Sequence, residues 1–384
     1  MFQDRQKATT VAALGIAQTL AWASSYYLPA ILARPMAAEL GLSPSAIYGW
    51  FSAALLLTAL LGPVVGRAID RRGGRPVLAL SNLVFAAGLL LLGTAQGQAG
   101  LGAGWLLLGI GMALGLYDAA FATLAGLYGA AAKGPITGVT LFAGFASTIG
   151  WPLTTLLEAE IGWRGACLAW AALQLLLGLP LNRLLVPPAP PPAPKSTATG
   201  EAAPAPAHAM LVIGFVFAAT GIVTAAVAAH QPALLAAAGA SPELALLAAS
   251  LTGPAQVGAR LLQFGLLGNL HPLWTSRFAC VMQGLGTAVL LLLGGPAAVA
   301  FTLLYGAGNG LHTIARGTLP LAVFGPVGFG QRQGLLSAPA RLLQAGAPLA
   351  FGLLLEGYGA MAGLAGILAL CLAAFAALFA LRVR

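Results

Sequence analysis

Long apolar runs alternate with short polar breaks along the whole chain, and this pattern predicts membrane-spanning helices. A helix needs about 20 mostly apolar residues to cross a bilayer, and twelve stretches reach that length between breaks of glycine, proline or charge. Helices are expected because open strands leave backbone groups unsatisfied in lipid. The predicted spans are 10–33, 45–66, 77–96, 102–129, 135–157, 163–186, 210–236, 242–265, 276–294, 297–322, 333–355 and 360–381.

One long polar interruption divides these spans six and six. Residues 187–209 are rich in proline and alanine and show no apolar periodicity, which predicts a semi-extended, solvated linker. The expected domains are therefore an N-terminal six-helix bundle over 1–186, the linker over 187–209 and a C-terminal six-helix bundle over 210–384.

Composition excludes a soluble protein. The 384 residues are 59% apolar and only 7% charged, whereas soluble domains carry about 25% charged residues. The net charge of +9 comes from scattered basic residues with no basic face, so nucleic acid is not an expected partner. Cys167, Cys280 and Cys371 lie far apart inside apolar runs, so neither a disulfide nor a metal site is expected.

The basic residues predict the orientation of the chain. If the N-terminus is cytoplasmic, only Arg34 and Arg164 fall outside, and three arginines lie within spans. Cytoplasmic loops of membrane proteins carry an excess of Lys and Arg, so both termini and the linker are expected in the cytoplasm. The thirteen cations on that side are Arg5, Lys7, Arg67, Arg71, Arg72, Arg75, Lys133, Arg183, Lys195, Arg277, Arg332, Arg382 and Arg384.

The two halves share short sequence matches in the same order. These matches predict a parallel repeat of two six-helix halves, with a binding site at their interface near the bilayer midplane. The matched pairs are Ser43-Pro44 with Ser241-Pro242, Leu61-Gly62-Pro63 with Thr252-Gly253-Pro254, Gly111 and Gly115-Leu116 with Gly306 and Gly310-Leu311, and Pro152 and Glu160 with Pro348 and Glu356.

The loop between the second and third spans carries a recognisable motif. Residues 66–75 read GRAIDRRGGR and resemble the signature loop of the major facilitator superfamily, G-x-x-x-D-R-x-G-R-R, with Gly73-Gly74-Arg75 where the family has Gly-Arg-Arg. The motif residues are Gly66, Asp70, Arg71, Gly73 and Arg75.

The resemblance implies a twelve-helix transporter fold over the whole chain, in which Asp70 is a gate element that pairs with helix ends. Independently of the family, Arg71, Arg72 and Arg75 can neutralise Asp70, and the glycines permit a tight turn. The alternative is a basic loop that only fixes orientation.

Ionisable residues inside the spans are the candidates for function, because they are costly in a membrane. Asp118 is an acidic residue well inside a span, and we expect it to carry a proton. The alternative is a structural salt bridge from Asp118 to one of three arginines that also lie within spans. These arginines are Arg260, Arg316 and Arg341.

The arginines predict an anionic substrate. Arg260 is expected to snorkel toward the cytoplasm, whereas Arg316 and Arg341 lie deeper and could grip a carboxylate or phosphate. Three cations against one anion favour an organic anion over a cationic drug, although Arg341 could equally lock its helix to its neighbours.

Polar and aromatic residues on five spans could line the same cavity. Each of them taken alone is more typical of an interhelical hydrogen bond than of a ligand contact. The candidates are Tyr26, Tyr27, His230, Gln231, Gln256, Asn309, His312 and Gln344.

Departures from the family narrow the function. Drug antiporters of this family usually carry an Arg where this chain has Trp105, and Gly150-Trp151-Pro152 lacks their flanking glycines. The remaining pattern is loosely similar to monocarboxylate-transporter-like anion carriers. Intramembrane enzymes are not indicated, since H-E-x-x-H and G-x-S-x-G are absent from the sequence.

The sequence therefore predicts a secondary active carrier that moves a small organic anion by alternating access with proton coupling. The alternatives are a proton-driven efflux antiporter for drugs or metabolites and a non-transporting membrane sensor with the same fold. No cofactor is expected, and the partners are the substrate, protons and the lipid bilayer. We expect a monomeric, multi-pass protein of the bacterial cytoplasmic (inner) membrane.

Overall fold

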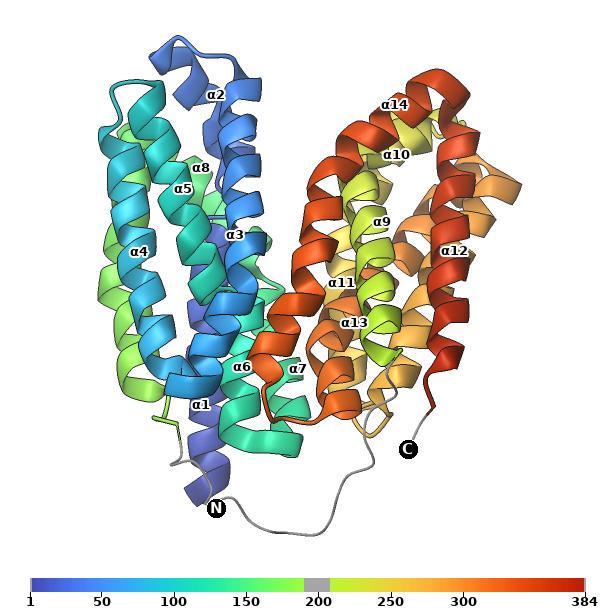
Figure 1. Ribbon diagram of the computed structural model, residues 1–384. Helices are drawn as coiled ribbons and strands as arrows, with labels where there is room; N and C mark the ends of the chain where they lie inside the picture. Colours follow the sequence, from blue (N-terminus) through green and yellow to red (C-terminus); the bar gives the residue numbers. More distant parts are fainter. Residues whose placement is uncertain (1, 190–207, 383–384) are drawn as a thin grey trace. The chain divides into compact units, whose positions relative to one another are not determined.

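The computed structural model describes residues 2–189 and 208–382, and these form helices without any strand (Figure 1). Most of the predicted linker, residues 190–207, lies outside the described residues. The chain divides into two compact units. Of the described residues, unit 1 contains 2–189 together with 325–338, and unit 2 contains 208–324 together with 339–382.

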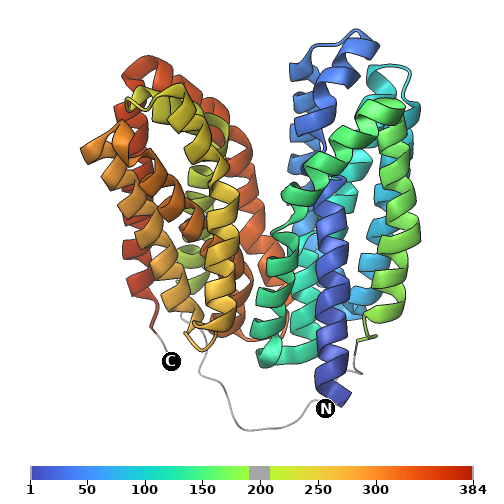
Figure 2. The ribbon, with the colours of Figure 1, turned by 180° about the vertical axis from the view of Figure 1, so that it is seen from behind.

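Unit 1 is a helical bundle whose interior is filled by large apolar side chains. Trp105, Trp170, Phe85 and Phe121 are fully buried within it. Helix α4 packs against α5 and α8, and α1 packs against α7, as the reverse view shows (Figure 2). Its helices are α1 (Phe2–Ala23), α2 (Pro29–Leu40), α3 (Pro44–Arg72), α4 (Gly74–Thr94), α5 (Gln98–Gly115), α6 (Tyr117–Tyr128), α7 (Lys133–Ala143) and α8 (Ala146–Leu173), followed by π-helical turns Gln174–Gly178 and Leu181–Leu185.

Three spans predicted as single helices are broken in unit 1, one of them at residues 144–145 between α7 and α8. The other two breaks lie near the start of unit 1 and in the span 102–129. Residues 24–28 separate α1 from α2 and precede Pro29, the first residue of α2. Leu116 separates α5 from α6 with extended backbone angles. A hydrogen bond of 2.5 Å from Gln18 Nε2 to the carbonyl oxygen of Gly115 satisfies an acceptor that this second break exposes.

Unit 2 repeats the helical plan with different breaks. Its core contains Phe301, Tyr305 and Leu364. Helix α14 begins in unit 1, where residues 329–338 belong, and continues in unit 2. The helices of unit 2 are α9 (Ala209–Ala237), α10 (Pro242–Ser250), α11 (Thr252–Gly265), α12 (Pro272–Leu293), α13 (Ala298–Phe324) and the larger part of α14 (Phe329–Ala377).

Some of the predicted sequence matches are structural equivalents. Ser43 and Ser241 each form the N-cap of a helix that starts with proline, and each hydroxyl accepts a hydrogen bond from the amide three residues later. Helices α8 and α14 share a kink with positive φ, at Gly162 (φ 71°) and Gly359 (φ 80°), a short distance after their matched prolines. The repeat is therefore visible in local structure.

Two matches are wrong in register. Gly109 packs against the backbone of Ala54, and Gly306 packs against that of Thr252. Because Ala54 and Thr252 stand at the same distance from their N-cap serines, Gly306 corresponds to Gly109 and not to Gly111. The two Gly-Pro pairs stand at different distances from those serines, and whereas Gly62 approaches another helix closely, Gly253 has open space around it.

The surface of the described helices is apolar, as a lipid environment requires. Leu176, Leu211 and Leu292 are 77%, 78% and 82% exposed. Six helical segments are long and apolar enough to cross a membrane, whereas α2, α6, α7 and α10 are each too short to do so alone. The count of twelve spans stays a prediction. The six segments are Pro44–Arg72, Gly74–Thr94, Gln98–Leu185, Ala209–Ala237, Pro272–Leu293 and Ala350–Ala380.

Candidate functional site

Asp70 lies at the N-terminus of α14. Its two carboxylate oxygens accept hydrogen bonds of 2.8 Å from the backbone amides of Gly330 and Gln331. The first amides of a helix lack partners within the helix, and the helix dipole favours an anion there. Asp70, at the end of α3, therefore caps a helix that is distant in sequence, within unit 1.

Four glycines bring α3 and α14 into close contact beside this cap. Gly62 and Gly66 on α3 face Gly334 and Gly330 on α14, and a Cβ on Gly66 or Gly334 would collide with the opposite backbone. Each helix thus carries a G-x-x-x-G pair, an arrangement that lets membrane helices approach closely. The proximity positions the amides of α14 for Asp70.

Asp118, which lies on α6, also contacts the first turns of α14. Its Oδ1 accepts hydrogen bonds from Gln333 Nε2 at 3.0 Å and from Ser337 Oγ at 3.2 Å. Gln333 and Ser337 are four residues apart and share one face of α14. Residues 330–337 are consequently held by a carboxylate from α3 and by another from α6.

The break at Leu116 determines where Asp118 stands. Because α6 begins at Tyr117, Asp118 lies in its first turn, where the helix dipole stabilises a negative charge. Gln18 is buried and holds the end of α5 at this break. Had the span been one continuous helix, as predicted, Asp118 would lie in mid-helix.

The glycines of the signature loop have separate roles. Gly73 ends α3 with φ 80° and donates a hydrogen bond of 2.8 Å to the carbonyl oxygen of Ile69. Gly74 lies directly against Thr123 of α6, with no space for a side chain. This contact accounts for the departure from the family pattern, because an arginine at position 74 would not fit.

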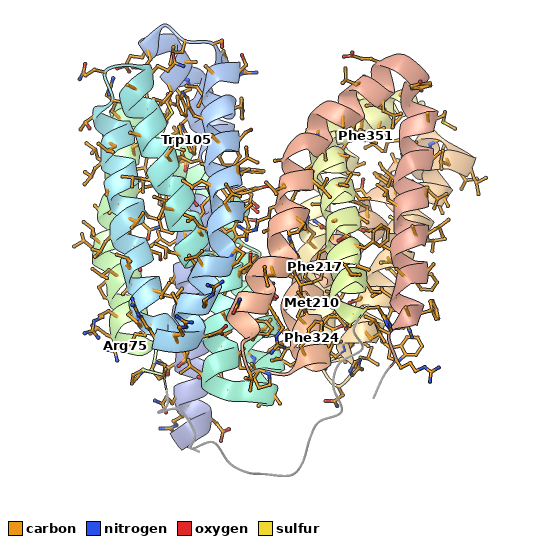
Figure 3. The ribbon with its side chains drawn as sticks, viewed as in Figure 1. Arg75, Trp105, Met210, Phe217, Phe324 and Phe351 are labelled. Carbon is orange, nitrogen blue, oxygen red and sulfur yellow. The ribbon has the colours of Figure 1, made fainter. Side chains whose placement is uncertain are left out.

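The arginines of the loop are not hydrogen-bonded to Asp70. Arg71 and Arg72 are exposed, and Arg75 is half-buried at one end of unit 1, the end opposite Trp105 (Figure 3). The hydrogen bonds that Asp70 accepts come instead from the amides of Gly330 and Gln331. Neutralisation of Asp70 by Arg71, Arg72 and Arg75 stays a prediction.

Arg260 is buried in unit 2 and does not snorkel. The residue is 5% exposed, and its guanidinium donates hydrogen bonds to Thr313 Oγ1 at 3.1 Å and to Gln256 Oε1 at 3.5 Å. The side chain of Arg260 was expected to reach the cytoplasmic surface. It does not, because the face of α11 that carries it packs against α13.

Arg316 and its neighbours lie on the adjoining face of α13. Arg316 is half-buried over the ring of Phe217 at 5.7 Å, and Figure 3 places Phe217 between Phe351 toward one end and Met210 and Phe324 toward the other. His312, one turn earlier, is 5% exposed and lies 3.9 Å from Cys280 Sγ. Asn309 Oδ1 accepts a hydrogen bond of 3.0 Å from Thr224.

Two predicted cavity residues hold helices together. His230 Nε2 lies 2.9 Å from the carbonyl oxygen of Pro348. Gln231 donates to Thr302 at 3.0 Å and accepts from Thr252 at 3.1 Å. These contacts agree with the interhelical hydrogen bonds that the sequence offered as the alternative. Gln344 and Arg341 are half-buried on α14.

Tyr26 and Tyr27 lie in the break between α1 and α2 and belong to an aromatic cluster. The ring centroid of Trp22 is 5.0 Å from that of Tyr26, 6.0 Å from that of Tyr27 and 5.0 Å from that of Tyr117. Both tyrosines are half-buried. The structure thus places both tyrosines among other aromatic rings of unit 1.

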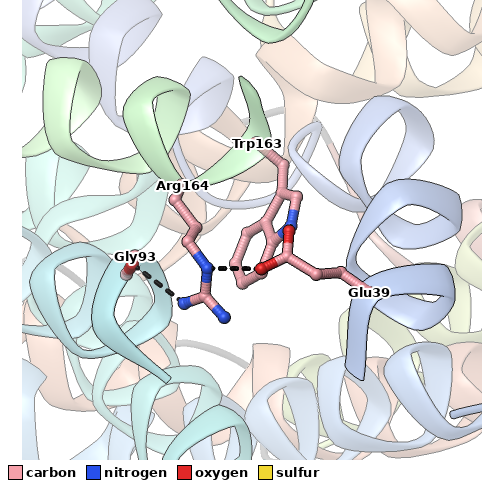
Figure 4. A network of polar contacts seen from close by, with 4 residues as sticks. All are labelled: Glu39, Gly93, Trp163 and Arg164. Carbon is pink, nitrogen blue, oxygen red and sulfur yellow. Dashed lines mark hydrogen bonds and ion pairs between the residues drawn. The ribbon is translucent and has the colours of Figure 1, made fainter. Parts of the chain in front are cut away.

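A separate polar network ties three helices of unit 1 together (Figure 4). Glu39 Oε1 accepts a hydrogen bond of 2.7 Å from Arg164 Nε, and Oε2 accepts one of 2.5 Å from the indole of Trp163. Arg164 also donates to the carbonyl oxygen of Gly93 at 3.1 Å. The hydrogen bond from Arg164 is the largest cause that lowers the pKa of Glu39 below its ordinary value.

Sequence reasoning missed the partners of the two carboxylates. Gln333 and Ser337 carry no charge, so a search for ionisable residues passes over them. A signal was nevertheless present, since Gly62 with Gly66 and Gly330 with Gly334 are matching G-x-x-x-G pairs. In the described parts of the chain, His, Cys, Asp and Glu do not form any group of three or more that could hold a metal ion.

Known structures with the same fold transport small molecules. The human organic anion transporter MFSD10 (TETRAN) is 18% identical, with a TM-score of 0.73 and coverage of 97% of this chain and 99% of its own. The proton:xylose symporter XylE, bound to 6-bromo-6-deoxy-D-glucose, is 13% identical, with a TM-score of 0.72 and coverage of 96% and 94%.

A variant of the E. coli fucose:proton symporter FucP is 15% identical, with a TM-score of 0.73 and coverage of 97% of this chain and 98% of its own. At these identities the similarity shows the fold. No curated protein matches the chain by sequence.

The sequence model of the Major Facilitator Superfamily matches residues 14–316, which is most of the chain. This match agrees with the signature loop and with the solved structures. The protein is thus a membrane transport protein and not an enzyme. It belongs to the major facilitator superfamily.

Proposed function

We propose that this protein is a proton-coupled secondary active transporter for a small organic anion, working by alternating access. The proposal includes twelve spans, with both termini in the cytoplasm, in a bacterial cytoplasmic membrane, and a monomeric protein. The excess of Lys and Arg in the loops assigned to the cytoplasmic side supports the orientation.

The observation that supports proton coupling is the pair of hydrogen bonds that Asp118 accepts from α14. An ionised carboxylate accepts strong hydrogen bonds from Gln333 and Ser337. Protonation replaces an acceptor with an O–H donor and removes the charge, so these contacts weaken. A proton on Asp118 therefore loosens the first turns of α14, the helix that runs from unit 1 into unit 2.

The charges of unit 2 support an anionic substrate. Arg260 and Arg316 lie on neighbouring helices, and Arg341 lies on α14. Glu243 and Glu356, the acidic residues within 208–382, are exposed. The interior of this unit is therefore electropositive, and guanidinium groups bind carboxylates and phosphates through paired N–H donors.

Uptake by proteoliposomes tests the proposal. Reconstituted protein would be offered labelled lactate and benzoate, with and without an inward proton gradient. Wild type is expected to accumulate one of them against its gradient. Asp118→Asn is expected to keep exchange of labelled for unlabelled anion but to lose accumulation.

Glu160→Gln is the matched control, because it makes the same change at an exposed residue. Accumulation that survives in Asp118→Asn would remove Asp118 from coupling. Failure of wild type to exchange any carboxylate, while a cationic compound exchanges, would overturn the anionic substrate.

A further inference from the structure

The aromatic cluster of unit 1 is a connected chain of rings. Tyr27 lies edge-on to Trp151 of α8, with ring centroids 5.7 Å apart, and contacts Trp22 at 6.0 Å. Trp22 in turn contacts Tyr117 of α6 at 5.0 Å. These distances are in the range of favourable aromatic pairs. The chain joins α8 to the residue immediately before Asp118.

The rings are not fully buried, unlike those of the core. Trp151 is 43% exposed, and Trp22, Tyr26, Tyr27 and Tyr117 are half-buried. Trp105 and Phe121, in contrast, have 0% and 1% exposure. The cluster therefore offers ring surface to another molecule.

The internal repeat argues that the fold does not need these rings. Trp151 precedes Pro152, and the residue before the matched Pro348 is Ala347. Tyr26 and Tyr27 stand three and two residues before Pro29, and the residues at those distances before Pro232 in α9 are alanine and His230. Helix α9 is continuous there, whereas α1 and α2 are separated by residues 24–28. Both the break and the rings are thus particular to unit 1.

An open, shallow groove along the exposed face of α8 adjoins the exposed end of the ring chain. Trp151 is a lining residue, together with Thr148 and Thr155 one turn on either side of it. The lining contains no charged side chain; its residues are Ser147, Thr148, Trp151, Pro152, Thr155, Leu156 and Ala159, all on α8.

We infer that Trp151 and Tyr27 form a subsite for the planar, unsaturated ring of the transported anion. This inference rests on the proposed transport function and names the class of substrate, an aromatic carboxylate or a similar ring-bearing acid. The ring stacks on the exposed indole, and the uncharged lining excludes the ionised group from this part of the site. Flat apolar rings gain from face and edge contacts with tryptophan and tyrosine that saturated rings of equal size do not make.

Binding of three matched probes to the purified full-length protein tests the subsite. The probes are 2-naphthoate, its saturated analogue decahydro-2-naphthoate, and the cation (2-naphthylmethyl)trimethylammonium. Titration calorimetry measures each affinity. Wild type is expected to bind 2-naphthoate about tenfold more tightly than the saturated analogue.

Trp151→Leu and Tyr27→Leu are expected to reduce this preference to less than about threefold. Trp274→Leu is the control, because Trp274 is 44% exposed and pairs with Phe278 in unit 2, outside the cluster. It should leave the preference unchanged.

Several results would overturn the subsite. They are equal binding of the two carboxylates to wild type, equal effects of Trp151→Leu and Trp274→Leu, tighter Trp151-dependent binding of the cation, or binding of none of the probes. Failure of the transport proposal looks different. In that case 2-naphthoate keeps its Trp151-dependent preference in solution, but reconstituted protein does not exchange it across the membrane.

Discussion

Asp70 Oδ1 lies 2.8 Å from the backbone nitrogen of Gly330, a residue 260 positions later in the chain. The second oxygen of Asp70 is equally close to the amide of Gln331. One carboxylate thus satisfies two of the amides that open α14. This contact, together with that of Asp118, makes residues 330–337 a segment whose position depends on two acidic groups.

Removing the charge of Asp70 should weaken this cap. Asp70→Asn keeps a hydrogen-bond acceptor but loses the interaction with the helix dipole, for a cost of about 0.3–1 kcal/mol at an exposed site and up to about 2 kcal/mol when partly buried. The expected result is a lower melting temperature and faster proteolysis between Gly325 and Gly330. Glu160→Gln is the control, because Glu160 is exposed and lies far from the N-terminus of its helix. Unchanged melting and proteolysis would show that the cap contributes nothing.

Adding a methyl group to Gly66 should disrupt the crossing of α3 and α14. A Cβ there collides with the carbonyl of Gly330, and overpacking typically costs about 1–3 kcal/mol. We expect Gly66→Ala to lower the melting temperature, and Gly334→Ala to do so as well. Gly126→Ala is the control, because its Cβ would meet nothing within 4 Å. Equal melting temperatures for all three variants would contradict the close crossing.

The network of Glu39 should make stability depend on pH. The pKa of Glu39 in the folded protein is below its ordinary value of 4.5, so the stabilisation is fully present above that pH. It is lost as the pH falls below 4.5 through the lowered pKa, because the folded state must then protonate Glu39. Wild type should have a higher melting temperature than Glu39→Gln at neutral pH, and the difference in melting temperature should shrink in acid. A difference independent of pH would contradict the ion pair with Arg164.

Substitution of Arg316 should separate charge from hydrogen bonding in anion binding. Arg316→Lys keeps the charge but loses the planar, two-pronged donor. If the guanidinium grips a carboxylate through two N–H groups, Arg316→Lys should weaken benzoate binding nearly as much as Arg316→Gln. Titration calorimetry of benzoate measures both variants. Full affinity in Arg316→Lys would indicate that charge alone suffices.

The sequence predicted the helical class and the family, and it singled out Asp70 and Asp118 as candidates. Apolar runs and the signature loop are local patterns, and they specify helices and a loop directly. The sequence did not predict the hydrogen-bond partners of the two aspartates, because Gln333, Ser337 and the amide of Gly330 are neutral and distant in the chain. The burial of Arg260 was not predicted for a similar reason. Apolar patterning does not show that Thr313 and Gln256 accept hydrogen bonds from its guanidinium.

The helix breaks also escaped prediction. Ser24 and Ser25 open the break at residues 24–28, and their hydroxyls donate back to α1, at 2.9 Å to Leu20 O and 2.6 Å to Ala21 O. The other three residues of the break are two tyrosines and a leucine. So short a segment does not end an apolar run of about 20 residues. The break at Leu116 is apolar, and a distant side chain, that of Gln18, stabilises it.

Hydrogen–deuterium exchange of the amides of residues 330–338 tests the central claim most directly, namely that the charge of Asp118 holds the start of α14. It would be measured at alkaline and at acid pH, corrected for the intrinsic rate, with the amides of α4 as the internal reference. The account predicts that at alkaline pH this segment is more protected in wild type than in Asp118→Asn, in which Asp70 still caps Gly330 and Gln331, and that the difference between the two proteins shrinks on acidification. Equal protection of this segment in wild type and in Asp118→Asn at both pH values would contradict it.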